Sequence, residues 1–108
     1  MAPTAPAVRP FLGPDVLAFA AQQGVMDLLQ PVLDMTQRVF PEARHIDTIL
    51  EYDPEMPGDR HIVVEVHIGP LAVSRSVERH WQWSRDLFRC CPSPSVCLFG
   101  LHVNVGEV

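Results

Sequence analysis

Histidines and carboxylates alternate with apolar residues in two stretches of the sequence. The first stretch holds His45 and Asp47, and the second holds Glu65 and His67. In a β-strand every second side chain points to the same face of the sheet, so each pair shares a face. Imidazole nitrogens and carboxylate oxygens are ligands for divalent metals such as zinc and manganese. The four residues are therefore candidate metal ligands if two neighbouring strands carry them.

A hairpin that pairs Tyr52 with Arg60 would gather these candidate ligands. In that register Asp47 lies directly opposite Glu65, and His102 joins the group if its own strand lies adjacent. Directly opposed like charges destabilise a sheet, and a bound cation would remove that cost. The alternative is an ordinary solvated face without any cofactor, because no established metal-binding motif supports the site independently.

A second group of candidate site residues belongs to a helix expected before Pro92. Trp83 lies off the apolar stripe of that helix, with Arg79 one turn away and Arg75 two turns away. Tryptophan and arginine are enriched at the centres of protein interfaces. We expect a partner-binding surface at Trp83, Arg79 and Arg75, and the alternative is that Trp83 packs at the margin of the sheet.

Other classes of function have less support in the sequence. No nucleophile motif, phosphate-binding glycine loop or dinucleotide fingerprint occurs, so nothing favours an enzyme. All eight basic residues are arginine and the formal net charge is −5. This charge disfavours nucleic acid as a partner, and only the arginine-rich third helix is a candidate for it. The most apolar stretch, residues 16–29, contains Gln22, Gln23 and Asp27 and predicts no membrane span.

The cysteine content bears on the compartment. Cys90, Cys91 and Cys97 make an odd count, which suits reduced thiols better than a set of disulfides. The first ten residues lack the apolar core of a signal peptide. The sequence therefore predicts a cytoplasmic protein.

The elements that position these residues follow from the period of the apolar pattern. Residues 1–13 contain several prolines among small side chains and predict a flexible tail, and residues 14–108 predict a single α+β domain. A helical period runs from residue 14 to Phe40, with a break expected near Pro31 because proline lacks a backbone donor. A period of two then predicts a hairpin, whose second strand should turn these residues to the core: Ile62, Val64, Val66 and Ile68.

A third helix and a third strand complete the pattern. The helix is expected to bury one stripe of residues at helical spacing: Val77, Trp81, Ser84, Leu87 or Phe88, and Cys91. The strand is expected over residues 96–105, beside either strand of the hairpin. The fold class is therefore α+β, with helices on one face of a three-stranded, mainly antiparallel sheet.

Four short motifs after residue 52 are informative together. They are Asp53-Pro54-Glu55, the run from Arg60 to Val66, Trp83 with Leu87-Phe88-Arg89, and Cys91-Pro92-Ser93-Pro94. With the element order they resemble a small bacterial family of uncharacterised α+β proteins over residues 15–105. The resemblance implies this element order and a bacterial cytoplasmic setting, and it implies no activity.

These observations predict a small cytoplasmic bacterial accessory protein that acts as a protein-interaction module. Its partner would be another protein or a second copy of the chain, and an antitoxin-like or regulatory role is one form of this function. The alternative is a metal-dependent binder or enzyme that uses the four hairpin residues His45, Asp47, Glu65 and His67. Nucleic-acid binding by the third helix is the remaining hypothesis.

Overall fold

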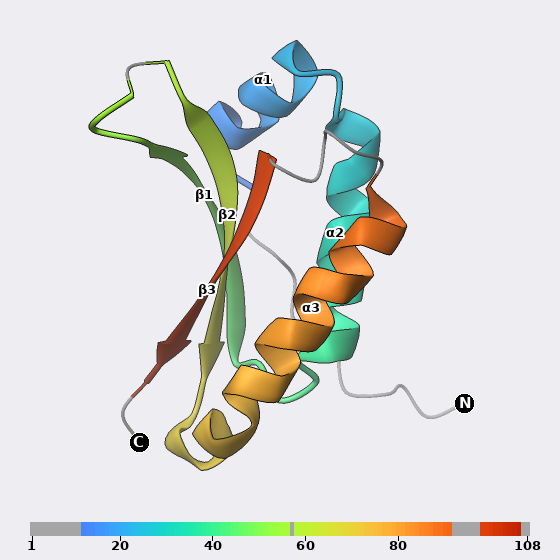
Figure 1. Cartoon of the computed structure of the whole chain (residues 1–108), viewed down its shortest axis with the longest axis vertical. Coiled ribbons are helices and arrows are strands. Elements are labelled where there is room, and N and C mark those ends of the chain that lie inside the picture. The colour runs from blue at the N-terminus through green and yellow to red at the C-terminus, as the bar shows by residue number, and fades with distance from the viewer. Residues whose placement is uncertain (1–11, 57, 92–97, 107–108) are drawn as a thin grey trace.

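The computed structural model describes residues 12–56, 58–91 and 98–106 of the chain. The elements, in order, are α1 (Pro14–Gln22), α2 (Met26–Val39), β1 (His45–Tyr52), β2 (Arg60–Ile68), the 3-10 helix η1 (Pro70–Arg75), α3 (Ser76–Cys90) and β3 (Phe99–Val105). The helices lie on one side of the three-stranded sheet (Figure 1). The predicted α+β class is confirmed, whereas the predicted tail, residues 1–13, lies outside the described residues except for its last two.

The sheet has the order β1-β2-β3, so β2 is its central strand. The β1 and β2 strands are antiparallel and pair Tyr52 with Arg60, which is the register predicted for the hairpin. The β2 and β3 strands are parallel. A parallel pair needs a long crossover connection, and η1 with α3 supplies it.

The inner face of β2 forms the middle of the hydrophobic core. Ile62, Val64, Val66 and Ile68 are each at most 1% exposed, as the two-residue period predicts. The side chains between them point to the opposite face of the sheet. The polar residues of β2 are therefore held on the face that the described helices leave uncovered (Figure 1).

The break between the first two helices falls at Gly24, and the break predicted near Pro31 is wrong. Gly24 has a φ angle of +71°, a left-handed conformation that glycine adopts without a steric cost. The helix α2 instead continues through Pro31, which lies in its second turn. Leu29, Val32 and Leu33 around this proline are all buried, and their burial outweighs one missing backbone hydrogen bond.

The buried face of α3 also differs from the prediction. Trp83 and Leu87 are buried, at 3% and 4% exposed, whereas Val77, Trp81 and Phe88 are 68%, 69% and 67% exposed. At 100° per residue the two sets lie roughly 120° apart around the helix. Both sets have helical spacing, so the pattern of α3 alone does not decide which one faces the core.

Contacts with α2 decide the orientation of α3. The Trp83 indole Nε1 donates a 2.9 Å hydrogen bond to Thr36 Oγ1, and that hydroxyl donates in turn to the Val32 carbonyl at 2.7 Å. Both side chains are buried, so this pair satisfies two polar groups that would otherwise be costly inside the core. The prediction that Trp83 is exposed is therefore wrong, because the indole donates its hydrogen bond to a hydroxyl inside the core.

Replacing each tryptophan by phenylalanine tests this orientation. Trp83→Phe should lower the free energy of unfolding by about 1–3 kcal/mol, because it leaves a buried hydroxyl with one partner fewer and opens a small cavity. Trp81→Phe, the matched control on the exposed face, should change it by less than about 0.5 kcal/mol. Urea unfolding followed by circular dichroism measures both, and equal losses would show that the helix is turned differently.

Candidate functional site

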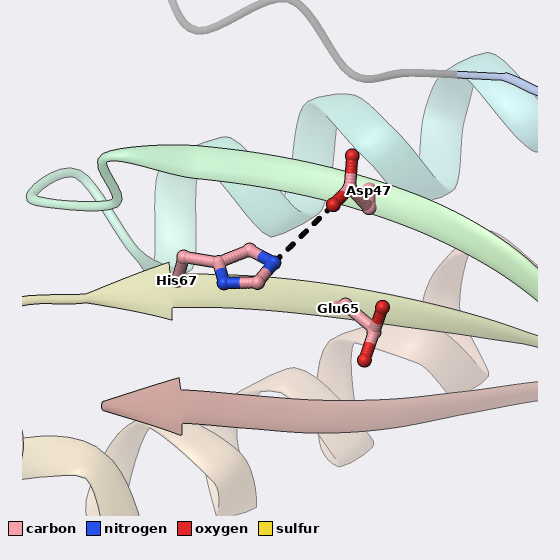
Figure 2. A group of neighbouring side chains, drawn as sticks. All are labelled: Asp47, Glu65 and His67. Atoms are coloured by element: carbon pink, nitrogen blue, oxygen red, sulfur yellow. Dashed lines mark ion pairs between the residues drawn. The ribbon is translucent and has the colours of Figure 1, made fainter. Parts of the chain in front are cut away.

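The outer face of the sheet brings the predicted metal ligands close together. Asp47 pairs with Glu65 across the β1 and β2 strands, and His45 pairs with His67. One ligand atom from each of Asp47, Glu65 and His67 lies within 4.8 Å of the other two. Figure 2 shows the His67 imidazole and the two carboxylates on this face of the sheet. Three of the four predicted residues thus form one cluster, which we call the outer-face cluster.

Asp47 lies between two histidines. Its Oδ1 is 2.6 Å from His45 Nε2, and its Oδ2 is 3.3 Å from His67 Nε2. The two imidazole rings are 5.4 Å apart between centroids and tilted by 42°. His45 therefore contacts the Asp47 carboxylate without belonging to the group of three whose ligand atoms lie within 4.8 Å of one another.

The Nε2 atom of His67 lies near the Asp47 carboxylate but makes no hydrogen bond within the described residues. It is shielded from solvent, and among the described residues no group meets it with hydrogen-bond geometry. The Asp47 carboxylate at 3.3 Å satisfies the distance of an ion pair only. A buried ring nitrogen without a partner is costly, so this atom is suited to bind a further group.

The third strand holds the Glu65 carboxylate in place. Asn104 Nδ2 donates to Glu65 Oε2 at 3.3 Å, and His102 Nδ1 lies 3.3 Å from the same oxygen. These contacts exist because β3 pairs with β2 and sets His102 opposite Glu65. The expectation that His102 joins the group holds for its contact with Glu65.

A second acid and histidine pair lies farther along the same face. Glu51 Oε1 is 3.4 Å from His61 Nε2, and the two residues are direct partners across the hairpin. This pair has the same chemical groups as the outer-face cluster but lacks a second carboxylate. It therefore offers a natural control for any property assigned to the cluster.

The predicted partner surface at Trp83, Arg79 and Arg75 is not assembled as expected. Trp83 is buried against α2, and the Arg79 guanidinium donates to the Val39 carbonyl at 2.9 Å and to Glu42 Oε2 at 2.7 Å. Arg79 thereby ties α3 to the end of α2. Arg75 is exposed, and both arginines line a shallow hollow of about 250 Å³. The two arginines thus share a surface from which Trp83 is absent.

The structure reveals a different exposed surface on α3. Val77, Trp81 and Phe88 follow one another at spacings of four and seven residues and point away from the core. A groove of about 450 Å³ lies beside the first two, and it is lined by Ser76, Val77, His80, Trp81, Ser84 and Val103. The sequence contains this stripe at helical spacing, but its apolar character favoured burial, so sequence reasoning assigned it to the core.

The two described cysteines differ in their surroundings. Cys91 is buried, and burial together with the neighbouring Cys90 raises the pKa of its thiol to about 11. A thiol needs to ionise before it can attack a substrate or bind a metal tightly. Cys91 therefore keeps its proton at neutral pH and serves as a core residue, as the sequence pattern suggested.

Comparison with protein-family models, with curated proteins and with solved structures found no match to this chain. The resemblance to a bacterial family therefore stays a prediction. Within the described residues, no helix combines the length and the apolar character needed to span a membrane. The outer-face cluster and the exposed side of α3 are the two surfaces in the described part of the chain that carry candidate functional groups.

Alkylation tests the assignment of Cys91 to the core. With a pKa of about 11, only about one Cys91 thiol in a thousand is ionised at pH 8, and burial further restricts access. Iodoacetamide at pH 8 should leave Cys91 unmodified in the native protein and label it after unfolding in guanidinium, as read by fragment mass spectrometry. Equal labelling rates in the two states would contradict the buried position.

Proposed function

We propose that this protein is an interaction module that assembles with a second copy of itself through α3. The observation that carries the proposal is the row of exposed apolar side chains Val77, Trp81 and Phe88, which we call the α3 stripe. Scattered exposed apolar residues are ordinary, whereas several on one face of a helix, including two aromatic rings, are typical of a binding surface. The stripe spans about 16 Å along the helix axis.

The size of the surface suits a modest interface between two copies. The exposed apolar area of the α3 stripe is roughly 400 Å², about half of what one partner contributes to an interface of standard size. The neighbouring groove adds area from Val103 on β3. Tryptophan and phenylalanine are among the residues enriched at interface cores, so the composition also suits a protein partner.

An antiparallel arrangement of the two α3 helices makes the stripe complementary to itself. A two-fold axis that crosses the helix between Trp81 and Ser84 sets Phe88 of one copy against Val77 of the other. Val77 borders the groove, so the Phe88 ring meets a concave surface to which Val77 and Trp81 contribute. Two-fold symmetry uses the same patch on both copies, and it is the commonest symmetry among soluble oligomers.

Charges along one flank of the stripe favour the same arrangement. Glu78 in the first turn of α3 lies on the same flank as Arg85 and Arg89 farther along the helix. In an antiparallel pair of helices, this flank of one copy lies against the same flank of the other copy, which runs in the opposite direction. Glu78 of each copy then lies near Arg85 and Arg89 of the other, so opposite charges face each other across the interface.

The wider role that fits this proposal is a bacterial cytoplasmic accessory protein. The resemblance drawn from the sequence motifs supports the bacterial setting. The free thiols of Cys90 and Cys91 support a reducing compartment.

Mass measurement by light scattering after gel filtration tests self-association. At about 100 μM the protein should run at twice its chain mass of 12.1 kDa. Trp81→Glu should weaken the dimer at least about 30-fold, because a central aromatic residue contributes about 2 kcal/mol or more. Tyr52→Glu, an equally exposed aromatic position on β1, is the matched control and should leave the dimer intact.

The result that contradicts the proposal is a wild-type protein that stays at 12.1 kDa at this concentration. A dimer that survives Trp81→Glu would place the interface elsewhere, and a monomer that binds a different protein through Trp81 would replace self-association. Thermal melts of both variants confirm that they fold, since both sites are exposed.

A charge exchange tests the antiparallel geometry separately. Glu78→Arg and Arg85→Glu should each weaken the dimer, because each replaces an attractive pair by a repulsive one across the interface. The double variant E78R/R85E should regain most of the lost affinity, because the attraction is restored with its signs reversed. Equal and additive losses in the double variant would rule out contact between these two positions.

A further inference from the structure

The geometry points to a binding site for a divalent transition-metal ion at the outer-face cluster, with Asp47, Glu65 and His67 as ligands. This site lies on the face of the sheet opposite the helices, so it shares no residue with the α3 stripe. The three candidate ligand atoms lie within 4.8 Å of one another. Ligand atoms bound to one zinc ion at about 2.0–2.2 Å lie roughly 3–4 Å apart, so small side-chain rotations close the site.

The electrostatics of the sheet supply the first reason for a cation. Asp47 and Glu65 are direct partners across two antiparallel strands, and opposed like charges destabilise such a pair. Among the described residues, the ion pairs of both carboxylates go to histidines, which carry a positive charge only when protonated. A divalent ion between the carboxylates provides positive charge without depending on that protonation.

The His67 imidazole supplies the second reason. Its Nε2 atom is shielded from solvent and has no hydrogen-bond partner within the described part of the chain. The atom lies 3.3 Å from Asp47 Oδ2, so it is within reach of an ion that the carboxylate holds. A metal ion there would supply the partner that this nitrogen lacks among the described residues.

The donor set selects the class of metal. One imidazole nitrogen with two carboxylate oxygens suits zinc, manganese, cobalt or iron, whereas calcium and magnesium prefer oxygen ligands alone. Three protein ligands also leave at least one coordination position for water.

Neighbouring residues orient the ligands from outside. His45 Nε2 lies 2.6 Å from Asp47 Oδ1 and leaves the other carboxylate oxygen toward His67. Asn104 donates to Glu65 Oε2 from β3, which leaves Oε1 for an ion. Such supporting contacts fix the direction of metal-binding carboxylates and raise metal affinity. His45, predicted as a ligand, thus takes the role of a positioning residue.

Calorimetric titration of the tag-free, metal-stripped full chain with zinc chloride tests the site. We expect saturable binding of one zinc ion per chain and a rise in melting temperature on zinc addition. Asp47→Asn and Glu65→Gln should each weaken zinc binding at least tenfold, because even residues that only support a ligand cost ten- to a hundredfold. Both side chains are partly exposed, so both variants should fold.

Glu51→Gln is the matched control, because it alters a carboxylate paired with a histidine on the same face of the sheet. It should leave zinc affinity unchanged. Absence of saturable binding, or equal weakening by Glu51→Gln, would overturn the proposal and mean that the cluster is a network of acids and histidines only. Zinc binding that survives the cluster variants and disappears in Cys90→Ser would also overturn it, by placing the metal at a thiol. None of these outcomes alters the mass measured for the dimer.

Discussion

Burial of one face of β2 determines where the polar groups of the sheet lie. Ile62, Val64, Val66 and Ile68 cannot leave the core, and a strand places alternate residues on opposite faces. The polar residues between them are therefore fixed on the outer face. Because β2 is central in the sheet, it also sets the register of both neighbouring strands. A slip of one residue would exchange core and surface along the whole strand, so the register is strongly specified.

The same constraint explains why the outer-face cluster could be predicted from sequence. The apolar period on β1 and β2 fixes which residues share a face, and the hairpin register follows from pairing Tyr52 with Arg60. Counting residues along the two strands from that pair then places Asp47 opposite Glu65. The sequence could not show that His45 turns toward Asp47 from outside the cluster, because side-chain direction depends on packing around each strand.

The orientation of α3 could not be predicted, because the helix carries two stripes of apolar residues. Choosing between them required knowing that Thr36 on α2 offers a buried acceptor to the Trp83 indole. The break at Gly24 was missed for a similar reason. Local preference places a break at Pro31, but the burial of its neighbours keeps that turn helical. In both cases contacts between elements overrode the preference of a single segment.

The edge strand β3 connects the two surfaces of the molecule. Asn104 points outward and donates to Glu65, while the adjacent Val103 lines the groove beside the α3 stripe. Consecutive residues of a strand move together, so the position of β3 affects both the carboxylate and the groove. The strand pairs with β2 along one edge only within the described residues, and its inner side is incompletely covered. Covering the α3 stripe would therefore restrict the strand that also positions Glu65.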